Sequence, residues 1–275
     1  MTVRDLAAYH KLITDSYDKR SKTYWGNQAN AYPLVENVPP RSGDRVLDIG
    51  TGTGIAAFHA ATFVGSNGSV TGVDISNGMI TRANELLRER VTTNIIFQIS
   101  DAEDLPFPSN SFDRIYCASA FFWIVNKVKA LRHWNDLLVP GGIVGFHAWP
   151  EDSYVHSYVA QQVLKNYGIT YLAHTPTGSK DICTDMMRKA GYEQIRIVEK
   201  EEGGYISLQE AKDSWINAEH YPIGQYPHPV TDVPPEVLEQ ARRDYNLEME
   251  RRNTDKGIWN NTALYFVYGT KPISA

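Results

Sequence analysis

The chain has 275 residues, of which 42% are apolar and 21% charged, and its formal net charge at pH 7 is −5. This length and apolar fraction suffice for one large domain or for a domain with a lid. The negative balance disfavours nucleic acid as the main partner, because phosphate binding requires a basic face. The longest apolar run, residues 115–125, is shorter than the roughly 20 residues that span a bilayer, so no membrane insertion is expected.

The first half of the chain alternates between strand and helix patterns. Residues 1–40 are predicted to form an N-terminal helical segment, which ends at the paired prolines before residue 41. Ser76 can cap the helix that follows the second strand. Strands are expected at 45–50, 70–76, 94–99, 112–120 and 143–149, and helices at 55–64, 77–90 and 129–138. This order with short links indicates a doubly wound α/β fold, a parallel sheet covered on both faces.

The second half is less regular. Helices are expected at 157–167, 183–192, 207–220 and 234–252, and strands at 194–200 and 263–271. The mostly helical stretch 205–258 lies between the last two strands, and it is interpreted as a lid insertion. The main α/β domain then comprises residues 41–204 and 259–275.

A glycine-rich loop follows the first strand, in the stretch VLDIGTGTG at residues 46–54. In a doubly wound sheet, ligands bind beyond the carboxyl ends of the strands, and glycines let a loop touch a ligand without a Cβ in the way. A dinucleotide fingerprint reads G-x-G-x-x-G and would need a glycine where the chain has Ile55. The actual spacing, with glycines at Gly50, Gly52 and Gly54, disfavours a pyrophosphate ligand and a nicotinamide-dependent oxidoreductase.

Acidic residues end the next two strands. Asp74 ends the second strand, where an acidic side chain is the expected partner of a ribose diol. Asp101 follows the third strand, where a carboxylate can accept an exocyclic adenine N–H. Each carboxylate taken alone could instead be a turn or cap residue. Together with the loop, they predict a nucleoside site without a phosphate cradle.

Four segments resemble, in order, the motifs of class I S-adenosylmethionine-dependent methyltransferases: VLDIGTGTG, VTGVDIS, DAEDLPFPSNSFDRIYCASA and LVPGGIV. They are most similar to the branch with the ubiquinone/menaquinone-biosynthesis C-methyltransferases and many small-molecule methyltransferases. The resemblance runs from about residue 44 to 146, and beyond it only the layout is similar. SYDKRSKTYW, residues 16–25, resembles the tyrosine-containing helix that leads into such domains. The family implies a Rossmann-like, seven-stranded, mostly parallel sheet whose last strand is antiparallel.

The resemblance also implies S-adenosylmethionine as the cofactor and assigns roles to residues. Asp48 would support the glycine loop and the methionine ammonium group, and Ser119 would face the methionine moiety. Tyr17 could close over that end. The cofactor-binding residues expected on this basis are Asp48, Gly50, Gly52, Gly54, Asp74, Ile75, Met79, Asp101, Ala102 and Ser119.

His147 is the first candidate for a general base, because it ends the fifth strand at the rim where substrate should sit. A histidine hydrogen-bonded within the rim is the alternative interpretation. Tyr17 is a second catalytic candidate, and Tyr24, His220 and His228 are weaker ones. Relatives often carry a histidine after the fourth strand, but this chain has an aromatic run there, which suggests an apolar wall or plain core packing. The substrate-binding candidates are Phe122, Trp123, Trp149 and Trp215, with Phe121 in the same run.

The expected function is transfer of a methyl group from S-adenosylmethionine to a small, largely apolar or aromatic metabolite, at oxygen, carbon or nitrogen. The alternative is a cyclase or isomerase of the same fold that holds the cofactor and transfers nothing. A macromolecular substrate is disfavoured by the acidic balance and the expected lid. No metal site is expected, and a homodimer is compatible with the sequence. Two isolated cysteines, Cys117 and Cys183, favour a reduced, cytoplasmic protein.

Overall fold

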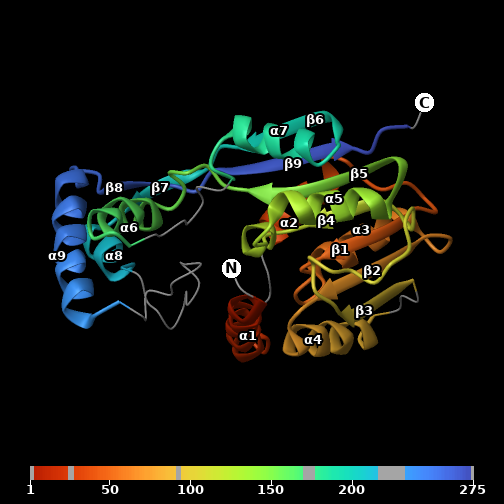
Figure 1. Cartoon of the computed structure of the whole chain (residues 1–275), viewed down its shortest axis with the longest axis horizontal. Coiled ribbons are helices and arrows are strands. Elements are labelled where there is room, and N and C mark those ends of the chain that lie inside the picture. Colours follow the sequence, from red (N-terminus) through yellow and green to blue (C-terminus); the bar gives the residue numbers. More distant parts are fainter. Residues whose placement is uncertain (1–2, 24–27, 91–93, 170–176, 216–232, 274–275) are drawn as a thin grey trace. The chain divides into compact units, whose positions relative to one another are not determined.

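The computed structural model describes residues 3–23, 28–90, 94–169, 177–215 and 233–273 (Figure 1). The chain divides into two compact units. The helical unit comprises Met1–Ser16, Trp149–Ser179 and Glu199–Leu264, and the sheet unit comprises Tyr17–Ala148, Lys180–Val198 and Tyr265–Ala275. Within the described ranges, none of the helices combines the length and the apolar character needed to cross a membrane.

A seven-stranded sheet forms the centre of the sheet unit, in the order β3-β2-β1-β4-β5-β9-β6. Strands β1 to β5 pair in parallel, and β9 runs antiparallel to β5. The predicted doubly wound, mostly parallel sheet is therefore confirmed. The bounds are β1 Arg45–Ile49, β2 Ser69–Asp74, β3 Ile95–Ile99, β4 Phe112–Cys117, β5 Leu138–Ala148, β6 Glu193–Lys200 and β9 Leu264–Thr270.

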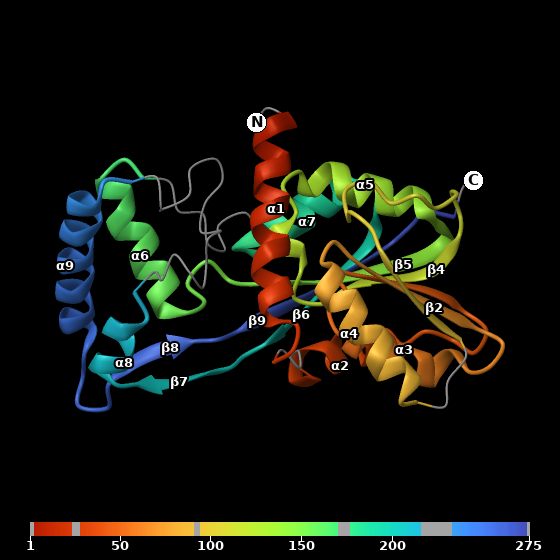
Figure 2. The same ribbon diagram turned by 90° about the horizontal axis from the view of Figure 1, so that it is seen from below.

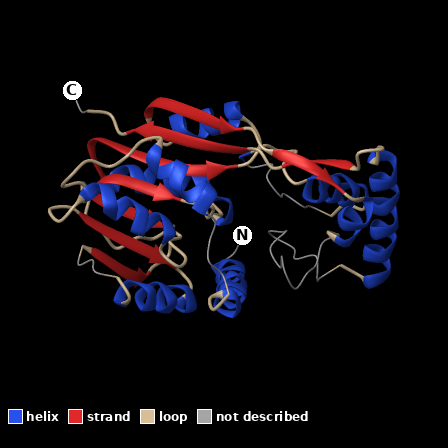
Figure 3. Cartoon of the chain, turned by 180° about the vertical axis from the view of Figure 1, so that it is seen from behind, coloured by secondary structure: helices blue, strands red, loops and turns tan. Residues whose placement is uncertain are grey.

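Helices cover both faces of this sheet. Figures 2 and 3 show α5 and α7 on one face and α2, α3 and α4 on the other. In agreement with this arrangement, α2 packs against α3, and α5 packs against α7. The bounds are α2 Gln28–Glu36, α3 Ile55–Val64, α4 Asn77–Arg88, the 3₁₀ turn η1 Phe121–Trp123, α5 Lys127–Leu137 and α7 Lys180–Lys189, and α1 is Val3–Arg20.

Helix α2 is an integral part of the sheet unit, although it belongs to the segment expected to precede the main domain. Leu34 and Val35 are fully buried. Two tyrosines of the sheet donate hydrogen bonds to the end of this segment, Tyr268 to the carbonyl of Leu34 at 2.9 Å and Tyr116 to that of Val38 at 2.5 Å. Burial of these apolar side chains and pairing of these carbonyls fix the segment on β4 and β9.

Most element boundaries in the first half follow the sequence closely, but β5 does not. The predicted break at residues 139–142 is absent, because β5 begins at Leu138 directly after α5. The register between β4 and β5 shifts between Phe112 and Arg114, and this irregularity takes up the extra residues around Pro140. Gly141 has φ +78°, a conformation that few other residues adopt readily.

In the helical unit, three helices and a two-stranded antiparallel sheet surround a common core. These elements are α6 Val155–Asn166, α8 Leu208–Asp213, α9 Pro235–Arg252, β7 Gly203–Ile206 and β8 Ile258–Asn261. Ala241, Tyr245 and Met249 lie on one face of α9 and are fully buried, as their spacing predicts. The Tyr245 hydroxyl donates to the carbonyl of Ala211 at 2.6 Å, which ties α9 to α8.

This unit differs from the expected lid at residues 205–258. Helix α6, assigned to the main domain by sequence, packs against α8 and α9 instead. The two-stranded antiparallel sheet of β7 and β8, which the sequence analysis missed, lies within the same unit. The helix expected at 207–220 ends at Asp213, and its last predicted residues, 216–220, lie outside the described ranges.

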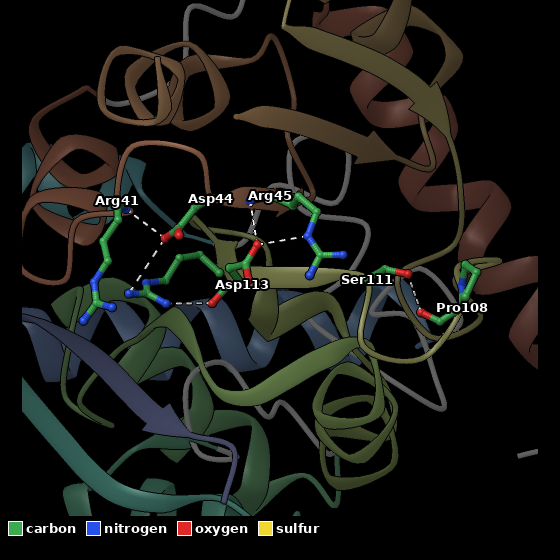
Figure 4. A network of polar contacts seen from close by, with 7 residues as sticks. Arg41, Asp44, Arg45, Pro108, Ser111 and Asp113 are labelled. Carbon is green, nitrogen blue, oxygen red and sulfur yellow. Dashed lines mark hydrogen bonds and ion pairs between the residues drawn. The ribbon is translucent and has the colours of Figure 1, made fainter. Parts of the chain in front are cut away.

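The amino ends of β1 and β4 carry a polar network (Figure 4). Asp113 Oδ2 accepts from the backbone N–H of Arg45 at 2.8 Å and from its Nε at 3.0 Å. Asp44 Oδ2 accepts from the backbone N–H of Arg41 at 2.8 Å and lies 3.8 Å from Arg114 Nη2. The network therefore joins the starts of two central strands, at the end of the sheet opposite to the glycine loop.

Candidate functional site

Four loops follow neighbouring strands at the carboxyl edge of the sheet. The strand order reverses between β1 and β4, and this switch point is where doubly wound sheets bind ligands. Along the edge from β3 to β4, the chain places Asp101, Asp74, the loop of residues 50–54, and Ser119. The residues predicted from sequence for the cofactor therefore come from adjacent loops at the position the fold favours.

Asp48 is a buried carboxylate in β1, directly before this loop. Its Oδ2 accepts from the Thr51 hydroxyl at 2.6 Å and from the backbone N–H of Ala57 at 3.0 Å. Within the described residues, its buried Oδ1 has no hydrogen-bond partner. The pKa of Asp48 is raised to about 7, mainly by burial and to a smaller extent by the charge of Asp74, while the hydrogen bonds from Thr51 and Ala57 lower it. Asp48 thus holds the loop with one oxygen and leaves the other unused.

The glycines of the loop are required by its backbone. Gly50, Gly52 and Gly54 have φ values of +66°, +55° and +91°, in the left-handed region. A Cβ on Gly50 would also lie 2.3 Å from the Cβ of Ala120, so the glycine lets the loop approach the turn after β4. A Cβ on Gly54 would lie 2.6 Å from Phe97 Cζ.

Asp74 joins the glycine loop to the loop after β2. Its Oδ2 accepts from the backbone N–H of Gly52, and its Oδ1 from that of Ser76, both at 2.9 Å. Burial raises the pKa of Asp74, backbone hydrogen bonds from Ser76, Gly52 and Ile75 lower it, and the nearby Asp18 carboxylate raises it. Each carboxylate oxygen can accept a second hydrogen bond, so the group retains capacity for a hydroxyl pair.

The next residues of this loop are placed by the start of α4. Ser76 is the N-cap, as the sequence predicts, and its hydroxyl accepts from the backbone N–H of Met79 at 3.1 Å. Met79 is fully buried, whereas Ile75 is half-buried. Of these two residues, which the family resemblance assigns to the cofactor with the adenine between them, Ile75 retains accessible surface.

The loop after β3 is fixed by its own polar contacts. Asp101 Oδ1 accepts from the backbone N–H of Glu103 at 2.9 Å, which closes a turn within the loop. The carbonyl of Ala102 accepts from Trp134 Nε1 at 2.8 Å. Glu103 Oε1 accepts from the backbone N–H of Asn126 at 2.7 Å. The loop is therefore anchored to α5 and to the segment before it.

His147 is buried and hydrogen-bonded one residue before the end of β5, as in the alternative interpretation of the sequence, and its role as a base stays a prediction. Its side chain in β5 has no exposed surface, and its ring packs edge-on against Phe266 of β9. The backbone N–H of Ser119 donates to His147 Nδ1 at 3.0 Å, and Ser119 Oγ lies 3.0 Å from the same atom. Ser119 has φ +55°, so the buried imidazole stabilises a left-handed turn at the end of β4.

The aromatic run after β4 divides between the core and the site. Phe121 is fully buried against Phe146 and Trp134, which is plain core packing. Phe122 and Trp123 are half-buried and pack on each other. Tyr17 joins them, because its hydroxyl accepts from Trp123 Nε1 at 3.1 Å and the two rings meet edge to face.

The remaining predicted residues lie elsewhere. Trp149 and Trp215 belong to the helical unit, where Trp149 is buried and Trp215 packs on Tyr245. Tyr24, His220 and His228 lie outside the described residues. Across the ranges that the structure describes, no group of three or more His, Cys, Asp or Glu side chains could hold a metal ion.

Two residues near the loops were not found by sequence reasoning. Asp18 Oδ1 accepts from the backbone N–H of Gly78 at 2.8 Å and from the Ser76 hydroxyl. Lys127 Nζ donates to the carbonyls of Phe122 and Ile124, at 3.3 and 2.7 Å. Burial lowers the pKa of Lys127 to about 8, against the opposing charge of Glu103. The one sequence signal for Asp18 is its position directly after Tyr17, which the sequence analysis names as a candidate.

Residues 46–142 match a family model described as a methyltransferase domain. Aklanonic acid methyltransferase DauC from Streptomyces sp. (strain C5) is 37% identical over 145 residues, which cover 51% of this chain and 66% of DauC. The ubiquinone/menaquinone biosynthesis C-methyltransferase UbiE from Coxiella burnetii is 33% identical over 140 residues, which cover 50% of this chain and 54% of UbiE. The chain thus spans about half to two thirds of the length of these curated relatives.

Solved structures share the fold at lower identity. The YcgJ protein from Bacillus subtilis has a TM-score of 0.60 at 19% identity, and the match covers 90% of this chain and 99% of that one. Phosphoethanolamine N-methyltransferase 2 from Haemonchus contortus, solved with S-adenosylhomocysteine, has a TM-score of 0.55 at 19% identity, covering 90% of this chain and 53% of that one. The [4+2]-cyclase SpnF has a TM-score of 0.55 at 18% identity, covering 90% and 82%.

Sequence match, strand order and the succession of loops agree with one another. Residues 46–142 therefore form a methyltransferase domain, on the fold that these solved structures share.

Proposed function

We propose that this protein binds S-adenosylmethionine at the carboxyl edge of its sheet and transfers the methyl group to a small, largely apolar or aromatic metabolite. The observation that carries the proposal is the placement of Asp74, the glycine loop and Asp48 on adjacent strand ends at the switch point. In this arrangement, the carboxylate proposed to bind ribose and a loop with three glycines lie next to Asp48, which has a buried carboxylate oxygen without a partner within the described residues.

The adenosine half of the cofactor fits the loops after β2 and β3. Asp74 retains acceptor capacity on both oxygens for the ribose hydroxyls, since each oxygen uses one lone pair on a backbone N–H. Ile75 offers accessible apolar surface beside it for the adenine ring. Asp101 and the backbone of Ala102 follow on the next strand, where the exocyclic amine is expected.

The methionine half fits the loop after β1. Asp48 Oδ1 is buried and without a partner among the described residues, and such an oxygen is stabilised by a cationic donor. An ammonium group there would lower the pKa of Asp48 from about 7, so that the carboxylate becomes charged when the cofactor binds. Ser119 follows β4, which lies across the switch point from β1, and its backbone N–H donates to His147 of β5.

When bound, S-adenosylmethionine supplies an electrophilic methyl group on a sulfonium sulfur that needs no acid to leave. The residues of this chain therefore have to align the acceptor and exclude water, and such positioning can contribute about 7–11 kcal/mol at the extreme. A base is required only where the acceptor carries a proton that must be removed. Among the described catalytic candidates, His147 is buried, and Tyr17 is proposed to close over the methionine end, where its hydroxyl accepts from Trp123 Nε1.

Two observations support a small, apolar or aromatic acceptor. Phe122 and Trp123 present half-buried rings directly after the Ser119 turn. The relatives DauC and UbiE are named for aklanonic acid and for ubiquinone/menaquinone biosynthesis, both small-molecule pathways. Trp149 and Trp215 of the helical unit stay proposed as further substrate contacts.

Methyl-labelled cofactor tests the proposal directly. The purified chain is incubated with a panel of small phenols, quinols and aromatic acids, with aklanonic acid included because of the DauC relative. Transfer of label to an acceptor, with one S-adenosylhomocysteine formed per product, supports the function. Tight cofactor binding without transfer to any acceptor counts against it.

A cofactor-binding cyclase or isomerase is the second candidate. It is favoured by the burial of His147, the imidazole that is the first candidate for a base. A product of the same mass as its precursor, formed without release of S-adenosylhomocysteine, would distinguish this candidate from a methyltransferase.

A further inference from the structure

The last turn of α1 is attached to the first turn of α4 through one carboxylate. Asp18 Oδ1 accepts from the backbone N–H of Gly78 at 2.8 Å and from the hydroxyl of Ser76. A Cβ on Gly78 would lie 3.0 Å from both Cα and Oδ1 of Asp18, so the two helices approach closely at a residue without a side chain. The carboxylate also lies where the partial positive charge of a helix N-terminus stabilises an anion.

This contact continues into the candidate cofactor site. The Ser76 hydroxyl donates to Asp18 while it accepts from the backbone N–H of Met79. The backbone N–H of Ser76 donates to Asp74 Oδ1, and Asp74 Oδ2 accepts from the backbone N–H of Gly52. An unbroken series of hydrogen bonds therefore runs from α1 through the α4 cap and the ribose-binding carboxylate to the glycine loop.

The neighbouring residue of α1 makes a contact on the other side of that loop. The Tyr17 hydroxyl accepts from Trp123 Nε1 at 3.1 Å, in the turn that follows β4. In the sheet, β1 lies between β2 and β4. Consecutive residues of α1 thus connect to the loop after β2 and to the turn after β4, and the glycine loop after β1 lies between these two in the strand order.

We propose that Asp18 is a positioning residue for the cofactor site: it seats the last turn of α1 on the α4 cap, and so fixes Asp74 and Tyr17 in the geometry that binds the nucleoside. The inference rests on the proposed function for the identity of the ligand. Asp18 itself is not assigned a contact with the cofactor, and its effect is transmitted through Ser76 and through the helix turn it shares with Tyr17.

Titration with S-adenosylhomocysteine tests the consequence for binding. Asp18→Ala removes the acceptor and is expected to weaken binding about tenfold, whereas Asp18→Asn, which keeps an oxygen at the same place, should stay within about threefold of the wild type. Asp15→Ala is the matched control, because Asp15 lies on the same helix in an exposed pair with Lys11 and should change nothing. Thermal melts establish that each variant is folded.

Kinetics separate positioning from a general structural role. Asp18→Ala should raise KM for S-adenosylmethionine while kcat stays nearly constant, because the loss falls on binding of the cofactor. In Asp18→Asn, KM for S-adenosylmethionine should return to near the wild-type value. Equal loss of kcat in both variants, with KM unchanged, would overturn the inference.

Hydrogen exchange without ligand tests the attachment itself. The peptide covering residues 76–81 should exchange faster in Asp18→Ala than in the wild type, and at the wild-type rate in Asp15→Ala. If the wild type fails to bind S-adenosylhomocysteine, the proposed function fails and the exchange result still decides whether the attachment exists. If the wild type binds and Asp18→Ala matches it in affinity, the positioning role is refuted and the proposed function stands.

Discussion

Ser119 is hydrogen-bonded to the buried side chain of His147, because its backbone N–H donates to His147 Nδ1 at 3.0 Å. An accepting Nδ1 places the proton of the neutral ring on Nε2. The pair joins the end of β4 to β5 and holds Ser119 at φ +55°. The histidine predicted from sequence as a base is thus a buried residue that shapes the turn facing the proposed methionine site.

Replacement of His147 distinguishes these roles. Asn places its amide oxygen near the position of Nδ1, whereas Gln places its amide nearer to Nε2, so His147→Gln should be the more damaging change. We expect His147→Gln to lose about 1–3 kcal/mol of unfolding free energy, because Ser119 N–H loses its buried acceptor. Denaturant unfolding measures this difference. A large loss of kcat in both variants, with stability unchanged, would show that the imidazole takes part in the chemistry.

Gly50→Ala should abolish cofactor binding while leaving a folded protein. The new Cβ would lie 2.3 Å from Ala120 Cβ, in a residue whose φ is +66°, so the loop and the turn after β4 have to separate. Gly43→Ala is the matched control: its φ is +89°, and nothing lies within 4 Å of its Cβ position. The control should lose only about 1 kcal/mol from the left-handed backbone. Calorimetry and thermal melts report both effects, and equal cofactor affinity in the two variants would contradict the expected close approach.

Asp48 should make stability depend on pH. Its pKa is raised by burial to about 7 in the folded chain, from 3.8, so the folded state binds more protons across this window. The stability that this group contributes is fully present below about pH 4 and is lost as the pH rises through about 7. Asp48→Asn removes the titrating group. The unfolding free energy of the variant minus that of the wild type should therefore be larger at about pH 8 than at about pH 5. Paired denaturant titrations at the two pH values measure this difference.

Cofactor binding provides the second test of Asp48. A cationic ligand lowers the pKa of a buried carboxylate, so binding should release protons near pH 7. Titrations in two buffers of different ionisation enthalpy measure the number of protons released, and Asp48→Asn should reduce it. Proton release that is the same in the variant would remove Asp48 from the ligand site.

Tyr17→Phe should have a moderate effect. The variant keeps the edge-to-face contact with Trp123 and loses only the acceptor for Trp123 Nε1. We expect kcat/KM to fall by about tenfold or less, since a lost neutral hydrogen bond is worth about 1 kcal/mol. A fall of several orders of magnitude, together with loss of an alkaline limb in the pH–rate profile, would instead identify Tyr17 as the base.

Much of the fold between residues 45 and 148 could be predicted because its signals are local. The Ser76 cap, the glycine loop and the helix at 55–64 depend on neighbouring residues, and the structure has them where the sequence places them. The two-stranded sheet of β7 and β8 was missed because its strands show no alternating apolar pattern: β7 begins with two glycines, and Tyr205 and Trp259 are exposed. Its strands are recognisable only from their pairing with each other.

The candidate site shows the same division between local and distant causes. Asp74 and the loop glycines follow from spacing along one chain segment. The burial of His147 depends on pairing with Phe266 of β9, and the contact of Asp18 depends on a helix 60 residues further along the chain. Neither pairing leaves a pattern in the residues around it. Trp149 and Trp215 belong to a unit whose core forms between α6, α8 and α9. The expected lid at residues 205–258 did not include α6.

Calorimetric titration of the purified chain with S-adenosylmethionine is the most direct test of the central claim, that the carboxyl edge around β1, β2 and β4 holds an adenosyl sulfonium. Binding at one site is predicted, with an affinity at least about tenfold weaker in Asp74→Ala, because the variant removes the acceptor of both the ribose hydroxyls and Gly52 N–H. Absence of heat with S-adenosylmethionine, or unchanged affinity in Asp74→Ala, would contradict the claim.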